Sequence, residues 1–403
     1  MKPLRLVVLG TLAGNPYAGM AWMQMQLAAG LRRLGHDVHY LEATSCWPYD
    51  PVRRQKVNDS EYAVPYLERV AERFGLGDRW AYRRSFSDRV WLGPSRGVAR
   101  ELLRRADAVF NVTGATHPIA EGLEIGRLVY YGTDPLIHEI AYSNGRPLSR
   151  TLIDAHHDCV TYGENIGTPA CPVPPLPRLR ARTRQPILLD EWAGGPPARG
   201  AFTTVGNWRQ AGLDMDFQGQ TYLWSKHHEF LKFLELPRRV GATLELATNR
   251  DDRRAVRPDD NEDVPALGLG DGDHGLLKAN GWRVVGAAFT ADPSEYQGYL
   301  TASRGEFTVA RDLHVRLKSG WFSERSACYL AAGRPVITQD TGFGAILPTG
   351  EGLFAFSTMD DALAAFDAVN SDYPRHSRAA RAIAEEYFRA ETVLSRMLAD
   401  LGF

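Results

Sequence analysis

The sequence is poor in cysteine, has no long apolar run and carries no excess of charge of either sign. Its 47 Lys and Arg residues nearly balance its 48 Asp and Glu residues, which gives a net charge of −1. This balance argues against a nucleic-acid surface, because phosphate binding depends on an excess of Lys and Arg. No apolar stretch approaches the ~20 residues of a membrane span. The composition therefore predicts a chain with neither a nucleic-acid partner nor a membrane span.

Cysteine usage and the start of the chain bear on the compartment. The four cysteines are scattered, with no Cys-x-x-Cys pair; they are Cys46, Cys159, Cys171 and Cys328. Neither a disulfide framework nor a structural zinc site is indicated. Residues 1–10 lack a small-residue cleavage pattern and are typical of a first strand, not of a signal peptide. We therefore expect a reduced, cytoplasmic protein.

The first 43 residues predict a strand, a helix and a second strand. "LRLVVLG" is an apolar run ending in glycine, as in a parallel strand that is buried on both faces. Apolar residues at helical spacing follow and end before Gly35; they are Met20, Met23, Leu27, Leu31 and Leu34. This unit places the loop from Gly10 to Gly19 at the carboxyl end of a strand, where open α/β sheets bind ligands. We expect acceptor contacts at Gly14, Asn15, Tyr17 and Gly19, the alternative being a plain connecting loop.

Further strands are predicted at 106–114, 126–134 and 158–167, each apolar and each ending in polar or glycine residues. Their shared ending indicates loops gathered along one edge of a sheet. The stretch 43–97 shows no clear repeat, and we interpret it as a helical insertion. Five prolines between Pro169 and Pro177 predict a stiff extended segment that lies outside any sheet or helix.

A second unit with the same alternation of strands and helices follows this proline-rich segment. It has strands at 201–208, 242–249, 281–288, 305–311 and 334–339, with helices between them. At 403 residues the chain exceeds the ~100–200 residues of one domain, so two are expected. We predict a Rossmann-like acceptor domain over 1–170, a linker over 171–200, a nucleotide-sugar domain over 201–380, and a helix over 381–403 that packs back toward the first domain. The acidic stretch 250–265 is interpreted as an exposed loop.

Two stretches carry a resemblance to a known family. The loop "GTLAGNPYAGMAW" and the segment "SERSACYLAAGRPVITQDTGFGAILPTGEGLFAF" resemble those of two-domain GT-B glycosyltransferases of the family-four-like group, in a bacterial subgroup. The resemblance implies two Rossmann-like domains facing a cleft, with the acceptor in the first and a nucleoside-diphosphate sugar in the second. It implies a sugar transfer to a small-molecule acceptor, for which we suggest a natural product, and no required cofactor beyond the donor.

The donor segment fits this resemblance chemically. A diphosphate needs backbone N–H groups at a helix start, and a helix beginning near Ser323 offers them after Ser319 and Gly320. The next strand brings a second loop to the same edge, with candidate sugar contacts at Asp340 and Thr341 and phosphate contacts at Gly342 and Gly344. However, Gly320 and Cys328 stand where the family has glutamates. Glu324, one helical turn before Cys328, either replaces the second glutamate or complements the helix dipole.

Candidate cations and acid–base groups complete the predicted site. The resemblance implies Arg209 and Lys226 as phosphate partners, and Arg311, Lys318 and Arg325 are near the donor segment in sequence; the alternative for each is a solvated charge. Acceptor activation needs a carboxylate or His, and the candidates are Asp134, His138 and Glu164. Asp134 could instead cap a helix that starts at Pro135.

Other functions fit less well. The sequence has no Gly-x-Ser-x-Gly elbow, Walker loop or His-Glu-x-x-His motif. Adjacent histidines on a helix point about 100° apart, so no metal site is predicted at His156–His157 or His227–His228. A sugar-nucleotide epimerase and a non-catalytic sugar-binding or nucleotide-binding protein remain the alternatives.

Overall fold

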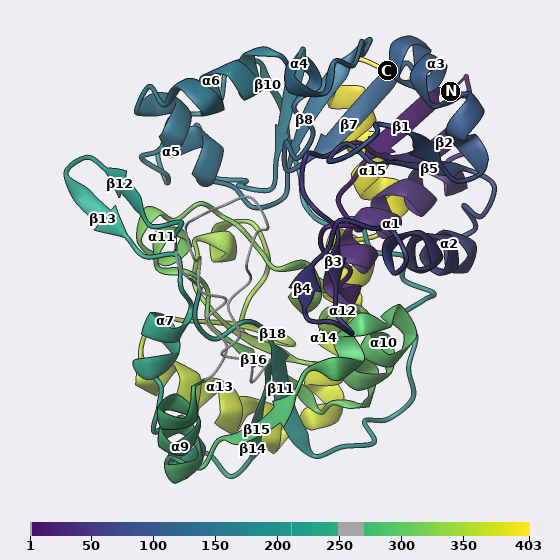
Figure 1. Ribbon diagram of the computed structural model, residues 1–403. Coiled ribbons are helices and arrows are strands. Elements are labelled where there is room, and N and C mark those ends of the chain that lie inside the picture. Colours follow the sequence, from purple (N-terminus) through teal and green to yellow (C-terminus); the bar gives the residue numbers. More distant parts are fainter. Residues whose placement is uncertain (1, 211, 249–269) are drawn as a thin grey trace.

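The computed structural model describes residues 2–210, 212–248 and 270–403, and the acidic stretch 250–265 lies outside these residues. Two sheets flanked by helices form the body of the molecule (Figure 1). We call the eight-stranded sheet with its helices the N-terminal unit and the six-stranded sheet with its helices the C-terminal unit. No helix of the described chain is both long enough and apolar enough to cross a membrane.

The N-terminal sheet has the strand order β10-β9-β8-β7-β1-β2-β5-β6, and only the β5–β6 pair is antiparallel. Its strands are β1 (Arg5–Leu9), β2 (Asp37–Glu42), β5 (Trp80–Arg83), β6 (Trp91–Leu92), β7 (Ala108–Val112), β8 (Leu128–Gly132), β9 (Asp158–Thr161) and β10 (Leu179–Arg182). β1 and β7 to β9 are buried along most or all of their length, which explains their continuous apolar runs.

Helices and short elements complete the N-terminal unit. They are α1 (Ala18–Arg33), the hairpin β3 (Tyr49–Asp50) and β4 (Gln55–Lys56), α2 (Ala63–Arg73), the 3₁₀ turn η1 (Pro94–Gly97), α3 (Ala99–Arg105), α4 (Pro118–Glu121), α5 (Ile137–Ser143) and α6 (Pro147–Asp154). The predicted first helix is confirmed, and it ends before Gly35, which adopts a positive φ of 88°.

Two sequence-based expectations for this unit are wrong. The stretch 43–97 is not simply a helical insertion, because β5 and β6 within it extend the sheet beyond β2. The expected linker over 171–200 is not free of sheet structure either: residues 169–177 form no strand, as predicted, but after the last proline β10 pairs in parallel with β9. β10 is an edge strand, and its arginines are exposed or half-buried while Ala181 is buried between them.

The C-terminal sheet is entirely parallel, with the order β15-β14-β11-β16-β17-β18. Its strands are β11 (Ala201–Val205), β14 (Thr243–Thr248), β15 (Arg283–Gly286), β16 (Gly305–Thr308), β17 (Val336–Gln339) and β18 (Leu353–Phe356). A separate antiparallel hairpin is formed by β12 (Met215–Phe217) and β13 (Gln220–Tyr222).

The helices of this unit are α7 (His227–Leu231), α8 (Leu236–Arg239), α9 (Asp271–Ala279), η2 (Ala288–Ala291), α10 (Pro293–Ala302), α11 (Asp312–Leu317), α12 (Glu324–Ala331), η3 (Phe343–Ala345), α13 (Met359–Ser371), α14 (Tyr373–Tyr387) and α15 (Ala390–Asp400). The segment 227–239 forms two short helices, α7 and α8, instead of one continuous helix. α8 starts anew at Leu236, with Pro237 in its first turn.

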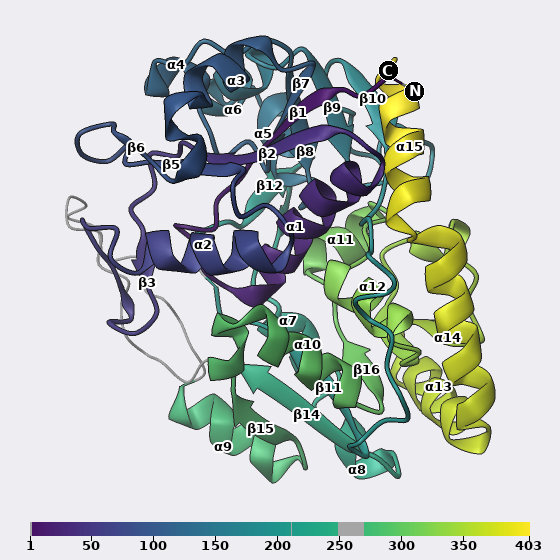
Figure 2. The ribbon, with the colours of Figure 1, turned by 90° about the vertical axis from the view of Figure 1, so that its right-hand side faces the viewer.

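Figure 2 shows α14 and α15 running along one side of both units. α15 packs against α1 and β10, and α14 packs against α12. The C-terminal end of the chain thus rests on the N-terminal unit.

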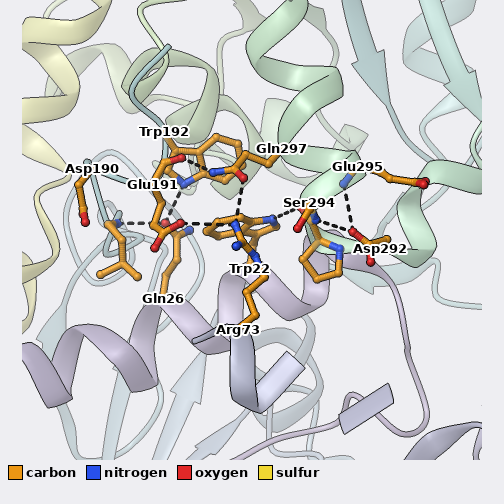
Figure 3. Close-up of polar contacts among 12 residues, drawn as sticks. Trp22, Gln26, Arg73, Asp190, Glu191, Trp192, Asp292, Ser294, Glu295 and Gln297 are labelled. Atoms are coloured by element: carbon orange, nitrogen blue, oxygen red, sulfur yellow. Dashed lines mark hydrogen bonds and ion pairs between the residues drawn. The ribbon is translucent and has the colours of Figure 1, made fainter. Parts of the chain in front are cut away.

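A seam of aromatic and polar contacts joins α1 to the C-terminal unit beside the connecting segment (Figure 3). The indole N–H of Trp22 donates to the carbonyl of Pro293 at 2.9 Å, and the rings of Trp22 and Trp192 lie 4.5 Å apart. Gln26 Oε1 accepts from Trp192 Nε1 at 3.1 Å, and Arg73 donates to Gln297 Oε1 at 2.9 Å. The buried indole donors of Trp22 and Trp192 both have partners, so the position of the two units relative to each other is fixed here.

The β12–β13 hairpin makes a second connection, on the opposite side of the molecule in Figure 1. Met215 and Phe217 from the hairpin share an apolar cluster with Leu136 and Ile140 from the N-terminal unit. Asn144 Nδ2 also donates to the carbonyl of Asp216 at 2.6 Å. The two units are therefore bridged on both sides of the region between the sheets.

A glycine pair tests the packing of α15 on α1. A Cβ at Gly30 would lie 2.6 Å from Leu394 Cδ1 and 3.3 Å from Ala390 Cβ, whereas one at Gly298 in α10 meets nothing within 4 Å. We expect Gly298→Ala to raise the free energy of unfolding by ~1 kcal/mol, the helix preference for Ala. Gly30→Ala should instead lower it by ~1–3 kcal/mol through overpacking. Urea denaturation measures both, and equal stabilisation would show that α15 does not pack as described.

Candidate functional site

The carboxyl ends of strands from both sheets meet between the units. Asp134, just after β8, accepts a hydrogen bond from Arg311 Nη1 at 2.9 Å, and Arg311 follows β16. Asn165, after β9, donates to the carbonyl of Gly342, which follows β17. Because parallel strands end at one edge of each sheet, the loops after four strands are brought together here.

A small pocket lies in this region at the start of α12. Its lining comes from the ends of β16 and β17, the loop before α12 and the first turn of that helix; the residues are Lys226, Thr308, Val309, Ala310, Trp321, Phe322, Ser323, Arg325, Thr338, Gln339, Thr341 and Phe343. Ser323 takes the N-cap position, but its side chain makes no capping hydrogen bond. The first N–H groups of a helix have no intrahelical partner, so this end of α12 can receive an anion.

The pocket is rich in positive charge. Lys226 Nζ lies 5.9 Å from the Trp321 ring centroid and has neither a hydrogen bond nor an ion pair with any described residue. Burial, aided by the guanidinium groups of Arg325 and Arg311, holds the pKa of Lys226 well below its usual value. Arg325 is held in place by Glu306 at 2.6 Å and Thr308 Oγ1 at 3.0 Å. Glu306 balances the charge of Arg325, so Lys226 is the group that an anionic ligand would pair with.

Some of the residues predicted to bind the donor line the pocket, and the others do not. Ser323 and Thr341 line the pocket with Lys226, but Gly344 is exposed and outside the lining. Asp340 is engaged within its own loop, because its carboxylate accepts from Lys318 Nζ at 2.8 Å and from the Gly342 N–H at 2.8 Å. Asp340 therefore acts on the shape of the loop in this structure.

Ser319, Gly320 and Gly342 lie beside the N-terminal unit. Ser319 is fully buried, with its Oγ 2.9 Å from His314 Nδ1. A Cβ at Gly320 would lie 2.9 Å from Asn165, and one at Gly342 would lie 2.6 Å from Asn165 Nδ2. The two glycines thus allow Asn165 to approach closely, a neighbour that the sequence did not indicate.

Neither Arg209 nor Glu324 is among the residues that line the pocket. Arg209 pairs with Asp273 through two contacts, at 2.6 Å and 3.0 Å. Glu324 accepts from Gln26 Nε2 at 2.8 Å and from Cys328 Sγ at 3.2 Å, so it faces α1 across the interface. Burial raises the pKa of Glu324 to about 7.

Asp134 joins the two units and does not cap a helix. α5 begins at Ile137 and not at Pro135, and Asp134 contacts both Arg311 and His314, the latter at 3.3 Å. Burial alone would raise the pKa of Asp134, but Arg311 and His314 lower it to about 2. A carboxylate with so low a pKa is a weak base at neutral pH.

The other two catalytic candidates are held differently. Glu164 accepts from Arg184 at 2.7 Å, an ion pair with both side chains largely buried. His138 lies in α5 with its ring edge-on to Tyr130, and its Nδ1 has no hydrogen-bond partner among the described residues. Burial, with His117 nearby, lowers the pKa of His138 to about 4, so the ring is neutral at pH 7.

The predicted acceptor loop is anchored at its base. Gly14 lies against Cys46, Asn15 is exposed, and Gly19 faces the Tyr296 hydroxyl at 3.7 Å from an added Cβ. Tyr17 occupies the N-cap position of α1, and its ring lies 5.8 Å from that of Tyr49.

Glu42, at the end of β2, is the anchor that sequence reasoning missed. Its Oε2 accepts from the Ala13 N–H at 2.9 Å, and its Oε1 accepts from Leu12 N–H and the Tyr40 hydroxyl. Burial raises the pKa of Glu42 to about 7. The signal available in the sequence was an acidic residue at the end of a predicted buried strand. A buried carboxylate is costly unless it is hydrogen-bonded, so its presence there indicates a polar partner.

His314 was also missed as a site residue, and it lies against Trp321. Their rings stack with centroids 4.7 Å apart, and Trp321 Nε1 donates to the Thr133 carbonyl at 3.1 Å. Arg311 lies 3.6 Å over the Trp224 ring. The contacts of Trp321 with Thr133 and of Arg311 with Trp224 join residues about 90 to 190 positions apart, so no local pattern indicates them.

The comparisons with known proteins bear on the fold. No protein-family model and no curated protein matches the chain. Among solved structures it is similar to AviGT4, a glycosyltransferase involved in avilamycin A biosynthesis, at 12% identity and a TM-score of 0.51 over 99% of this chain and 97% of that one. It is also similar to Anabaena HepE in complex with UDP-glucose, at 12% identity and 0.56 over 98% and 99%.

A third similar structure is an α-glucosyltransferase in complex with UDP and a 13-mer DNA, at 8% identity and a TM-score of 0.58 over 99% of both chains. At these identities the likeness concerns the fold. The expected architecture, two Rossmann-like units of the GT-B type, is confirmed along almost the whole chain.

The buried Glu324 predicts a pH dependence of stability. A carboxyl whose pKa rises from 4.5 to about 7 on folding favours the folded state most below pH 4.5, and this contribution is lost as the pH rises toward 7. Glu324→Gln should therefore reduce the fall in unfolding free energy between pH 5 and pH 8 by on the order of 1–3 kcal/mol. Urea titrations at both pH values measure it, with the exposed Glu386→Gln as control; an unchanged difference would contradict the burial of this carboxyl.

Proposed function

We propose that this protein is a glycosyltransferase that moves a sugar from a nucleoside-diphosphate sugar to a small-molecule acceptor. The observation that carries the proposal is the pocket at the start of α12, where Lys226 has no anionic partner among the described residues and Arg325 lies beside it. Cations and helix N–H groups that converge on one point stabilise the charge that develops on a leaving diphosphate. The GT-B architecture supports this assignment of the C-terminal unit to the donor.

The nature of the donor is proposed from the similar structures. HepE binds UDP-glucose, and the α-glucosyltransferase was solved with UDP. We infer a UDP-sugar as the donor and, from the resemblance of the segment 300–356, a family-four-like bacterial enzyme. AviGT4 acts in avilamycin A biosynthesis, which supports a natural product as the acceptor class.

The acceptor is proposed to bind to the N-terminal unit, at the loop that Glu42 anchors and beside α5. There His138 is the catalytic candidate whose Nδ1 has no partner among the described residues, whereas Asp134 and Glu164 are each paired with an arginine. The contacts between Asp134 and Arg311 and between the seam residues hold the units together, and closure of this kind excludes water from the donor.

Donor binding should be coupled to a proton. Burial and neighbouring cations depress the pKa of Lys226, so a bound diphosphate should raise this pKa again, and the protein should take up a proton at pH values between the pKa of the free and that of the bound state. We expect calorimetric titration of UDP in two buffers of different ionisation enthalpy to show this uptake in the wild type. Lys226→Ala should abolish it and weaken UDP binding by about ten- to a hundredfold, as expected for a lost charged hydrogen bond.

Lys278→Ala, an exposed lysine on α9, serves as the matched control and should change neither quantity. Absence of binding by any nucleoside diphosphate or its sugar to the wild type would remove the transferase assignment. Binding without sugar transfer to any acceptor would favour a non-catalytic nucleotide-binding protein, and conversion of the donor sugar would favour an epimerase.

The role of His138 is tested by kinetics. His138→Gln keeps a polar side chain but cannot act as a base, so kcat for sugar transfer should fall about 10²- to 10⁴-fold. UDP affinity should stay unchanged, because the donor pocket is lined by other residues. A kcat within threefold of the wild type would exclude His138 as the base.

A further inference from the structure

Asn165 connects the N-terminal unit to two loops of the C-terminal unit at once. Its backbone N–H donates to the carbonyl of Ser319 at 3.0 Å. Its side-chain amide Nδ2 donates to the carbonyl of Lys318 at 3.0 Å and to the carbonyl of Gly342 at 3.1 Å. One residue after β9 therefore supplies donors to the loop before α12 and to the loop after β17.

The two loops are shaped to receive Asn165. Gly320 and Gly342 have positive φ values of 76° and 89°, a backbone region that glycine enters without steric cost. A Cβ at either position would lie within 3.0 Å of Asn165. A hydrogen bond from the Gly320 N–H to the Thr341 carbonyl, at 2.8 Å, joins the two loops directly. Gly320, predicted from sequence to allow close approach before the helix start, and Gly342, predicted as a phosphate contact, thus serve the approach of this asparagine.

Asn165 is itself firmly oriented. It is only 5% exposed, and its backbone carbonyl oxygen accepts hydrogen bonds from the Thr168 N–H at 3.0 Å and from the Thr168 Oγ1 at 2.7 Å. Its side chain faces two carbonyl oxygens, which need N–H donors. An aspartate would place a carboxylate against those oxygens, so the amide is required chemically and not only for its size.

Both loops continue directly into the pocket. Trp321, Phe322 and Ser323 follow the first loop, and Thr341 and Phe343 belong to the second; all five line the pocket, whereas Asn165 does not. The first loop also meets the N-terminal unit where Trp321 donates to Thr133. The position of the pocket walls is therefore set from the N-terminal unit.

We propose that Asn165 is a positioning residue that holds the two donor loops together, so that the donor pocket is complete only when the N-terminal unit is docked on the C-terminal unit. The identity of the ligand in this statement rests on the proposed function. The holding of the loops does not, because it follows from the contacts of the unliganded protein.

The first measurement is hydrogen exchange of the unliganded protein. Asn165→Asp and Asn165→Ala should both exchange faster than the wild type in peptides covering 318–322 and 340–343. Asn144→Ala is the matched control, because it also deletes an asparagine that donates across the interface to a carbonyl, that of Asp216, but it touches neither loop. Unchanged exchange in both Asn165 variants would overturn the proposal.

The second measurement is the affinity for UDP and UDP-glucose, with the Michaelis constant for the donor where transfer is found. We expect both Asn165 variants to weaken UDP binding about tenfold, the effect of hydrogen bonds left unmade. The donor KM should rise with little change in kcat, a split that general destabilisation would not produce. Faster exchange with unaltered UDP affinity would limit Asn165 to the interface and reject its role in the pocket.

The two measurements separate the failure of this inference from that of the proposed function. If the wild type binds no nucleotide, the donor assignment fails, while the exchange data still decide whether Asn165 holds the loops. If Asn165→Asp does not fold, Asn165→Ala gives the same readouts without an added charge.

Discussion

The ion pair between Asp134 and Arg311 joins the carboxyl edges of the two sheets, and the candidate site depends on this junction. Asp134 lies after β8 and Arg311 after β16, with His314 as the second partner of the carboxylate. Loss of one member of a largely buried pair leaves the other charge uncompensated. The pair therefore requires the units to be in contact, and that contact brings the loops around Lys226 and Trp321 into place.

The polar groups of the interface differ in what they leave unpaired. At the seam, Trp22, Trp192 and Gln26 have hydrogen-bond partners, which is what a permanent contact requires. At the pocket, Lys226 lacks an ion-paired partner among the described residues, and its charge is disfavoured by burial and by Arg325. At the seam the polar groups have hydrogen-bond partners, whereas at the pocket the Lys226 side chain has no ion-pair partner among the described residues. This difference is expected where the seam holds the two units together and the pocket binds a ligand.

The sequence predicted the strands well, because buried parallel strands give continuous apolar runs with polar ends. The strands β1, β2, β7, β8 and β9 of the first sheet and β11, β14, β15, β16 and β17 of the second lie within the predicted ranges, whereas the edge strand β18 was not predicted. β5 and β10 were missed because each is short, lies near an edge of the sheet and is flanked by polar, aromatic or proline-rich sequence. At an edge, pairing with one neighbour decides the strand, and that neighbour is distant in sequence.

Of the candidate site, the sequence by itself determined the local parts: the helix start at Ser323, the two glycine-containing loops around it, and the presence of Lys226 and Arg325. Only the tertiary structure decided which of these parts face a ligand and which face the protein. Arg209 pairs with Asp273, and Glu324 accepts a hydrogen bond from Gln26. Gly320 and Gly342 pack against Asn165. The type of a residue determines what it can bind. What it does bind depends on which partner a distant segment places next to it, and the spacing of residues in the sequence carries no information about that segment.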